Sequence, residues 1–288
     1  MDIRAIEFFS GLGGWHYAVN GLGRVVSAYD ISEIANSVYK LNFGDSPIAR
    51  ELATISISEI SAPTANTWLM SPPCQPFCRM GKYRDLKDSR AAAFINLMDL
   101  LIEARPQRFV LENVEGFLES NSFALLAQRL DDIGLKWRCF KLCPTQFGIP
   151  NRRLRVYVAA SSNGVEDNIL PSIEPCPIAN YLDPDEDESL YLSAETIARH
   201  GPGLDLVTPE SRRSACFIGG YGKRFVGGGS FLKTQKGVRR FSPGEVSRLM
   251  GYPPGFRFLD ELPLNKHYKL LGNGLNIVVA KWVLNQLN

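Results

Sequence analysis

A cysteine enclosed by three prolines is the residue of this sequence best suited to chemistry. Cys74 lies in the run Ser71-Pro72-Pro73-Cys74-Gln75-Pro76-Phe77, directly after a short apolar strand predicted at residues 67–70. Each proline fixes its own φ at about −65° and restricts the residue before it, so the loop is stiff and holds the thiol in one direction. A cysteine that only fills a core needs no such loop, and we expect Cys74 to be a nucleophile.

Acidic and basic partners for a nucleophile occur at the ends of later strands. Glu112 lies near the end of an apolar strand predicted at residues 108–114. The segment Asn151-Arg152-Arg153-Leu154-Arg155 leads into another strand, at 154–160. In an extended segment Arg153 and Arg155 lie on the same face, where they form an anion clamp or carry solvated charge. Glu112 is either a catalytic carboxyl or an ordinary acid at a strand end.

A glycine-rich turn is the third chemical feature. The strand predicted at residues 3–9 runs into Ser10-Gly11-Leu12-Gly13-Gly14, and the next strand ends in Asp30. The glycines let the backbone approach a nucleotide-like ligand, and the acid is placed to accept hydrogen bonds from ribose hydroxyls. NAD, FAD and S-adenosylmethionine all fit this pair. The spacing Gly-x-Gly-Gly, in place of Gly-x-Gly-x-x-Gly, favours a ligand without a pyrophosphate.

Together these features fit one chemistry, the methylation of cytosine at carbon 5. That carbon is too weakly nucleophilic to take a methyl group from a sulfonium until a thiolate adds at carbon 6 and makes the ring an enamine. An acid hydrogen-bonded to ring N3 and the exocyclic amine stabilises the developing charge, as does an arginine near the 2-keto oxygen. The target base must be unpaired or flipped out of its helix to be reached.

Alternating strands and helices position these residues up to about residue 160. Besides the strands already named, the pattern predicts a strand at residues 25–30 and helices at 15–20, 33–41, 91–103 and 122–133. Such alternation predicts a mostly parallel sheet flanked by helices, an α/β fold of the Rossmann-like type. The polar residues follow the carboxyl ends of strands, where open α/β sheets bind their ligands.

Between residues 161 and 240 the sequence is rich in Pro and Gly and shows few regular periods. We predict a small target-recognition domain there, with residues 1–160 and 241–288 forming the catalytic domain and helices at 243–250 and 275–287. Eight basic residues and no acid lie between Glu210 and Glu245: Arg212, Arg213, Lys223, Arg224, Lys233, Lys236, Arg239 and Arg240. A surface this one-sided suits a phosphate backbone.

Composition excludes several other classes of protein. No apolar run is long enough to span a bilayer, and residues 1–5 do not begin a secretory signal, so we expect a cytoplasmic protein that is not bound to a membrane. Six cysteines in such a chain are more typical of reduced thiols than of a disulfide framework. The pairs Cys74 with Cys78 and Cys139 with Cys143 are spaced as metal ligands are, but none of the three histidines is placed to complete a site, and we expect no metal.

With these residues identified, the chain resembles the C5-cytosine methyltransferase family over nearly its whole length. Residues 9–14 resemble its first cofactor motif, Ser71 to Phe77 its catalytic loop, and Glu112-Asn113-Val114 its acidic motif. Gln146 to Asn151 lead into the arginine pair, and residues 248–253 and 271–274 resemble the last two motifs. The resemblance implies S-adenosylmethionine as cofactor.

The resemblance also implies roles for single positions. Cys74 would be the nucleophile and Glu112 the partner of N3, while Arg153 and Arg155 would hold the base and the acid. The cofactor contacts would be Phe9, Ser10, Gly11, Leu12, Gly13, Gly14, Asp30, Ile31, Ile55, Ser71, Asn273 and Gly274. The stretch Thr54-Ile55-Ser56 departs from the Asp found there in many DNA enzymes, so adenine recognition would depend on backbone groups.

The segment Cys216-Phe217-Ile218-Gly219-Gly220-Tyr221-Gly222 resembles the target-recognition signature of the tRNA aspartic acid branch of that family. Cys216, Phe217, Tyr221, Lys223 and Arg224 would then recognise the nucleic acid. Members of this branch modify a cytosine in the tRNA anticodon loop, where bases already splay outward. The branch usually has Cys-Phe-Thr-Lys where this chain has Cys-Phe-Ile-Gly, so tRNA is the expected substrate and DNA the alternative.

The sequence argues against two other functions, an inactive nucleic-acid-binding module and a thiol-dependent hydrolase. A catalytically inactive binding module would lack the nucleophile or the glycine turn, and a thiol hydrolase would need a histidine within a motif, whereas His16, His200 and His267 lie outside all of them. Cys78 is a bystander or an oxidation partner of Cys74. We expect a monomer.

Overall fold

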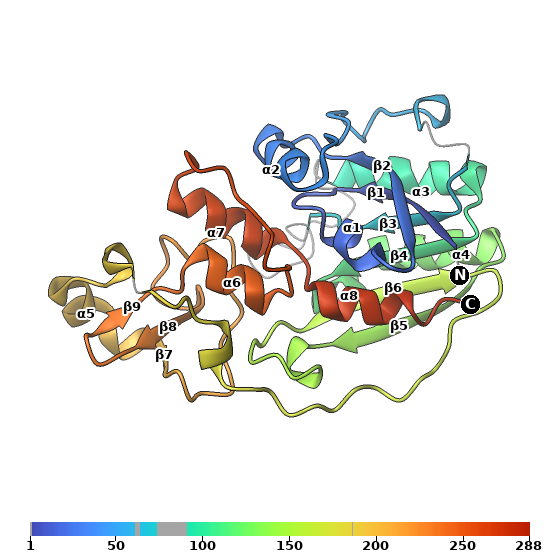
Figure 1. Ribbon diagram of the computed structural model, residues 1–288. Coiled ribbons are helices and arrows are strands. Elements are labelled where there is room, and N and C mark those ends of the chain that lie inside the picture. Colours follow the sequence, from blue (N-terminus) through green and yellow to red (C-terminus); the bar gives the residue numbers. More distant parts are fainter. Residues whose placement is uncertain (1, 61–63, 74–90, 186) are drawn as a thin grey trace. The chain divides into compact units, whose positions relative to one another are not determined.

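Six strands form the main sheet, and the sequence pattern predicted five of them. The computed structural model describes residues 2–60, 64–73, 91–185 and 187–288, and in that part of the chain the strand order is β2-β1-β3-β4-β6-β5 (Figure 1). The strands are β1 (Ile3–Phe8), β2 (Gly23–Tyr29), β3 (Thr67–Met70), β4 (Arg108–Asn113), β5 (Lys136–Leu142) and β6 (Arg155–Ser161). The first four in the order are parallel, whereas β6 runs antiparallel to both β4 and β5. The predicted mostly parallel α/β sheet is confirmed.

The predicted helices that follow β1, β2, β3 and β4 are also present. They are α1 (Gly14–Val19), α2 (Glu33–Phe43), α3 (Ala92–Ala104) and α4 (Asn121–Asp132). Ser32 caps α2 and Ser120 caps α4, each hydroxyl accepting a backbone N–H of the first turn, which is why these helices begin where they do.

The core of the sheet comes from strands that are apolar on both faces, as expected where helices cover a parallel sheet. Trp68 and Phe109, from adjacent strands, lie in one buried cluster with Leu97 of α3 and Leu126 of α4. Both helices are thereby fixed against the strands that lead to the predicted site.

Strand β5 is the element of this sheet that the sequence pattern did not predict. Its residues Lys136, Arg138 and Lys141 are charged, and among the described strands it pairs only with β6. Charged residues are typical of edge strands, where they discourage pairing with another chain, and they obscure the apolar signal.

The chain divides into two compact units. The first contains residues 1–142, 154–169 and 280–288, and the second contains residues 143–153 and 170–279. The predicted division into a catalytic and a target-recognition domain concerns function and stays a prediction.

The second unit contains a small sheet in the order β7-β8-β9 and further helices. Their bounds are β7 (Asp205–Val207), β8 (Ser230–Lys233), β9 (Val238–Arg239), α5 (Ala194–His200), α6 (Pro243–Leu249), α7 (Leu264–Asn273) and α8 (Ile277–Leu284). The last helix begins in this unit and ends in the first, where Trp282 packs edge-on against Phe140 of β5. The helices at 243–250 and 275–287 were predicted, although α8 is shorter, while α5 and α7 were not.

No helix in the described ranges is long and apolar enough to cross a membrane.

Candidate active site

The glycine turn follows β1 and brings its predicted partner, Asp30, into direct contact. The backbone N–H of Gly11 donates to Asp30 Oδ2 at 2.8 Å. Gly11 and Gly13 have φ angles of +51° and +76°, in the left-handed region that favours glycine. A Cβ at Gly13 would lie 2.3 Å from the ring of Phe43, whereas one at Gly11 would meet nothing within 4 Å. The turn is therefore closed on its α2 side and open beside Gly11.

Several features of this turn fit the adenosine part of S-adenosylmethionine. Ser10 Oγ is buried and has no hydrogen-bond partner among the residues described, which leaves it available to a ligand. Phe9 adopts a φ of +55°, a strained conformation for a residue with a side chain and one that is concentrated at functional sites. Ile31 exposes 65% of its surface directly after Asp30, so an exposed apolar residue follows the carboxylate in the sequence at the end of β2. These residues fit the cofactor.

The other predicted cofactor residues of the first unit have packing roles in the structure. Leu12, Gly14 and Ile55 are buried, and Ile55 belongs to the core of the sheet. Ser71 Oγ accepts a hydrogen bond from Trp15 Nε1 at 3.0 Å, which ties the end of β3 to α1. Contact of these residues with a cofactor stays a prediction.

The catalytic carboxyl predicted at the end of β4 has a cation beside it. Glu112 Oε1 lies 3.4 Å from Arg155 Nε, at the start of the antiparallel strand β6, and only 9% and 17% of the two side chains are exposed. The pair forms because the carboxyl end of β4 and the amino end of β6 are neighbours in the sheet. The structure thus brings together two residues that lie 43 positions apart in the sequence.

The segment that leads to Cys74 is attached to the same strand end. Asn113 Nδ2 donates to the carbonyl oxygen of Pro72 at 3.2 Å. Cys74, the predicted nucleophile, lies outside the described residues, as does Cys78. In the described part of the chain no three His, Cys, Asp or Glu side chains are grouped to hold a metal ion.

Arg153 belongs to the second unit, and only 3% of it is exposed. Its guanidinium donates to the carbonyl oxygens of Gly272 and Gly274, the former at 3.2 Å. It also approaches Cys216 Sγ at 3.4 Å. Strand β6 begins only at Arg155, so the extended geometry expected for residues 153–155 is present only in part. Arg153 links three segments of the second unit, and its contact with the base stays a prediction.

The predicted recognition residues divide into buried and exposed groups. Phe217 and Tyr221 are buried with their rings 4.9 Å apart, and Tyr221 Oη donates to the carbonyl of Ser230 at 2.6 Å. Lys223 and Arg224 are exposed. The two aromatic residues therefore pack inside the second unit, while the two cations are exposed, and their contact with a nucleic acid stays a prediction.

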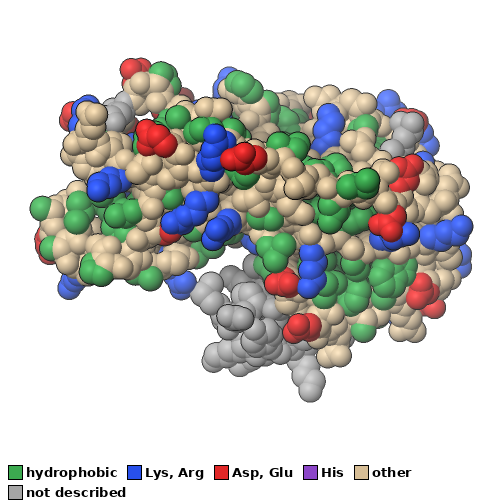
Figure 2. All heavy atoms as spheres, turned by 90° about the horizontal axis from the view of Figure 1, so that it is seen from below, with side chains coloured by type: hydrophobic (Ala, Val, Ile, Leu, Met, Phe, Trp, Pro, Cys, Tyr) green, Lys and Arg blue, Asp and Glu red, His purple; other side chains and the backbone are tan. Residues whose placement is uncertain are grey.

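The basic run between Glu210 and Glu245 is partly neutralised by acids. Arg239 lies 2.7 Å from Glu245 in a fully buried ion pair, and Arg213 contacts Asp205 at 2.5 Å. The guanidinium of Arg240 lies over the ring of Phe225 at 5.0 Å. Figure 2 likewise shows basic and acidic side chains interspersed on the face it presents. The run is less uniformly positive in space than in sequence.

Asn273 and Gly274, predicted to contact the cofactor, end α7 in the second unit. The carbonyl of Gly274 is one of the acceptors of Arg153. Their contact with the cofactor stays a prediction.

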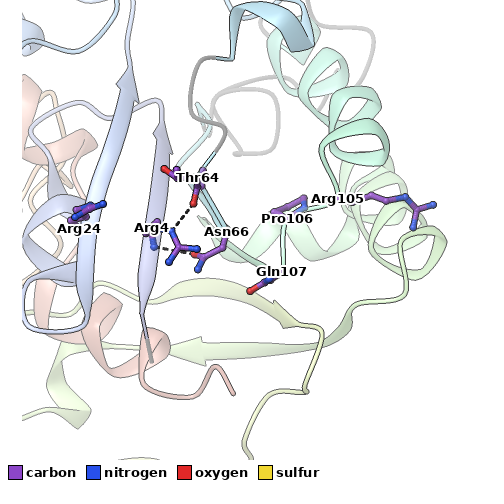
Figure 3. A pocket seen from close by; sticks show the side chains of 8 residues that line it. Arg4, Arg24, Thr64, Asn66, Arg105, Pro106 and Gln107 are labelled. Carbon is purple, nitrogen blue, oxygen red and sulfur yellow. Dashed lines mark hydrogen bonds between the residues drawn. The ribbon is translucent and has the colours of Figure 1, made fainter.

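A separate hollow of about 380 Å³ lies at the amino ends of the strands, opposite the ends that carry the candidate site (Figure 3). Its lining includes Arg4, Arg24, Asn66 and Gln107, which stand at or before the amino ends of β1, β2, β3 and β4. Arg4 is already engaged there, because its Nε donates to the carbonyl of Thr64 at 2.6 Å. The hollow is not part of the candidate site at the carboxyl ends.

Sequence reasoning missed one buried acid directly behind the turn. Glu7 of β1 is fully buried, and its Oε1 accepts the backbone N–H of Trp15 at 3.1 Å. Burial raises the pKa of Glu7 to about 8, and the nearby charge of Asp30 adds to the shift. The available signal was an acid inside the otherwise apolar run Ile6-Glu7-Phe8-Phe9.

Comparison with known proteins agrees with this geometry. The chain is 30% identical to the human tRNA (cytosine(38)-C(5))-methyltransferase, over 98% of this chain and 98% of that protein. It is also 30% identical to a DNA (cytosine-5)-methyltransferase of Dictyostelium discoideum, over 99% of this chain and 94% of that protein. The crystal structure of the Dnmt2 methyltransferase of S. pombe matches with a TM-score of 0.87 at 31% identity, over 98% of this chain and 97% of that one.

The sheet therefore has the α/β fold of S-adenosylmethionine-dependent methyltransferases. Residues 3–199 and 193–288 match the family described as C-5 cytosine-specific DNA methylase. Glu112, Arg155 and the glycine turn occupy the strand ends at which the sequence placed the family's motifs. The chain belongs to the C-5 cytosine-specific DNA methylase family.

Proposed function

We propose that this chain methylates carbon 5 of a cytosine in tRNA, with S-adenosylmethionine as donor and Cys74 as covalent nucleophile. The structural observation that carries the proposal is the 3.4 Å ion pair between Glu112 and Arg155 at the carboxyl end of β4. Full-length similarity to proteins named tRNA (cytosine(38)-C(5))-methyltransferase supports tRNA as the substrate.

The turn after β1 and Asp30 would hold the cofactor. Asp30 has already accepted the N–H groups of Gly11 and Ser32, both at 2.8 Å, and each carboxylate oxygen retains a lone pair for a ribose hydroxyl. Ser10 Oγ and the exposed side chain of Ile31 would contact the rest of the adenosine. When bound, the cofactor supplies an electrophilic methyl group.

The residues of the chain would perform the remaining steps. The Cys74 thiolate donates its electron pair to carbon 6 of cytosine, and the pair displaced from the carbon 5–carbon 6 double bond makes carbon 5 nucleophilic. Glu112 accepts a hydrogen bond from the exocyclic amine and, in its protonated form, donates one to N3, and Arg155 keeps that carboxyl group oriented. After transfer a base removes the proton from carbon 5, the double bond re-forms, and the carbon–sulfur bond to Cys74 breaks.

DNA is the second candidate substrate. The family is described as one of DNA methylases, and the Dictyostelium relative carries a DNA methyltransferase name. The catalytic residues serve either substrate equally well, because the chemistry concerns only the base. The choice would depend on residues 161–240, where Lys223 and Arg224 are exposed. We assign target recognition to that segment and catalysis to residues 1–160 and 241–288, in a monomer that acts in the cytoplasm.

The test supplies methyl-labelled S-adenosylmethionine to the chain with total tRNA and, in parallel, with genomic DNA. We expect label in tRNA, and in a single cytosine of the anticodon loop once the tRNA is sequenced. Label confined to DNA would contradict the tRNA assignment and leave the reaction intact. Cys74→Ala should abolish transfer while retaining cofactor binding. Cys139→Ala is the matched control, because Cys139 is exposed on β5 and should be dispensable.

A further inference from the structure

A buried carboxyl lies behind the cofactor turn without a counter-ion. Glu7 is 0% exposed in the middle of the sheet, between Ala28 of β2 and Leu69 of β3. Its carboxyl accepts the backbone N–H of Trp15 at 3.1 Å and the hydroxyl of Tyr39 at 3.2 Å. No lysine or arginine among the described residues forms an ion pair with it. A buried acid with neutral partners is costly to ionise. Glu7 lies in β1, three residues before Ser10, where the turn begins.

At pH 7 the Glu7 carboxyl group is mostly protonated and therefore neutral. Desolvation raises its pKa to about 8, so at pH 7 about 90% of the groups carry a proton. Asp30 opposes ionisation through its negative charge, while the hydrogen bonds from Trp15, His16 and Tyr39 favour it. A nearby positive charge would lower this pKa and favour loss of the proton.

A chain of hydrogen bonds connects this carboxyl group to a half-buried histidine. Tyr39 Oη lies 2.7 Å from His16 Nδ1, and the imidazole stacks on Phe43 at 3.9 Å between ring centroids. Burial lowers the pKa of His16 to about 4, although the charge of exposed Asp45 opposes the shift, so the imidazole is neutral at pH 7. Burial also raises the pKa of Tyr39, so that phenol does not ionise.

This series of hydrogen bonds can carry one proton from Glu7 to solvent without leaving a charge on Tyr39 or His16. When Glu7 is protonated, its Oε2–H points at Tyr39 Oη and the Tyr39 hydroxyl turns to His16 Nδ1, the reverse of the direction in which the hydroxyl donates to the ionised carboxylate. From that arrangement the Glu7 O–H bond breaks as a proton passes to Tyr39 Oη, and the Tyr39 proton passes to His16 Nδ1. The imidazole then releases the proton on its other nitrogen to solvent. The sum is one proton lost by Glu7 and one gained by water or buffer.

Binding of a cation near the turn would drive this loss. S-adenosylmethionine bears a sulfonium that its demethylated product lacks, so donor and product differ by one positive charge. A nearby positive charge lowers the pKa of a buried acid. The ionised carboxylate also accepts a stronger, charge-assisted hydrogen bond from Trp15 N–H, which fixes α1 and hence the turn that precedes it.

We propose that Glu7 is a positioning residue that releases one proton through Tyr39 and His16 when the sulfonium donor binds and recovers it once the neutral thioether product has formed. The chain thereby holds the donor more tightly than the product, and transfer of the methyl group itself loosens the site. The inference rests on the proposed function, because the identity of the cofactor belongs to that proposal.

The test measures cofactor dissociation constants by calorimetry from pH 7 to pH 9. If bound Glu7 is ionised throughout, linkage lowers the Kd of the donor by about tenfold over this range, because the free group changes from about 10% to about 90% ionised. The amino group of the donor titrates in the same range, so the quantity of interest is the ratio of wild type to Glu7→Gln. Glutamine keeps an acceptor for Trp15 N–H and has no proton to lose.

Two further measurements separate this role from a structural one. At pH 7, titrations in buffers of different ionisation enthalpy should show about 0.9 more protons released per donor bound by the wild type than by Glu7→Gln, and no such excess for the product. Tyr39→Phe removes a hydrogen bond that lowers the pKa of Glu7, so it should move the pH dependence upward.

The outcomes are distinct. Equal pH dependence in wild type and Glu7→Gln, or equal linkage for donor and product, would overturn the role of Glu7 while leaving the proposed function standing. A wild-type protein that binds no S-adenosylmethionine at any pH would overturn the cofactor assignment, and this inference with it.

Discussion

Replacing Arg155 by Met should damage catalysis mainly through Glu112. The Nε–Oε1 distance of 3.4 Å, with an effective dielectric constant of about 20, corresponds to a direct attraction of about 5 kcal/mol. Most of that attraction offsets the desolvation of two side chains that are 17% and 9% exposed, which leaves a net coupling of about 1–3 kcal/mol. Arg155→Met should therefore lower kcat by about 5-fold to 160-fold.

A double-mutant cycle isolates this coupling. Glu112→Gln, Arg155→Met and the double variant are compared with wild type in single-turnover methyl transfer to tRNA. Since Arg155 acts by orienting Glu112, the double variant should be little worse than Glu112→Gln alone. Additivity within about 0.5 kcal/mol would refute the reasoning, because it would mean that the two residues act independently.

A matched control is available on the neighbouring strand. Arg138 of β5 forms an ion pair with Asp167 at 2.8 Å, but both side chains are largely exposed. Exposed pairs contribute little, so Arg138→Met should leave transfer unchanged.

Three other perturbations have expected outcomes. Gly13→Ala places a Cβ 2.3 Å from Phe43 at a φ of +76°, so it should lower the free energy of unfolding by at least about 1–2 kcal/mol in urea titrations and weaken cofactor binding in calorimetry. Between its ordinary pKa of 4.5 and its folded-state pKa of about 8, Glu7 holds more protons in the folded than in the unfolded chain, so its contribution to stability falls as the pH rises across that window, by up to about 1.4 kcal/mol per pH unit. Between about pH 4 and 6.5 the depressed pKa of His16, about 4, offsets this fall, because there the unfolded imidazole holds a proton that the folded one lacks. The net fall in the free energy of unfolding of the cofactor-free chain is therefore expected between about pH 6.5 and 8, and not in Glu7→Gln. Lys223→Ala should reduce the slope of log affinity for tRNA against log salt by about 0.7, measured by filter binding, without changing kcat.

Local signals in the sequence predicted the parts of the site that are built from neighbouring residues. The turn at 10–14 was predictable because its glycines follow an apolar strand, and Asp30 because the next strand ends there. The placement of Glu112 at a strand end followed from its apolar run, and β4 indeed ends at Asn113.

Other features depend on contacts that no local pattern contains. Arg153 binds carbonyls 119 and 121 residues later, so its burial was not visible in the sequence, where an arginine in a polar segment indicates a surface charge. Glu7 and Tyr39 lie 32 residues apart and meet only because α2 packs behind β1. The basic run likewise gave no sign that Arg239 would be buried against Glu245. Contacts between residues far apart in the sequence determine all three features.

The covalent step is the central claim, and trapping it is its most direct test. In RNA that carries 5-fluorocytidine at the target position, carbon 5 has no proton to remove, so the cysteine adduct should persist after methyl transfer. Incubation of the wild-type chain with such an anticodon stem-loop and S-adenosylmethionine, followed by peptide mass spectrometry, should locate the adduct on Cys74. No adduct should form with Cys74→Ala. An adduct on another cysteine, or continued methylation of ordinary tRNA by Cys74→Ala, would contradict the mechanism.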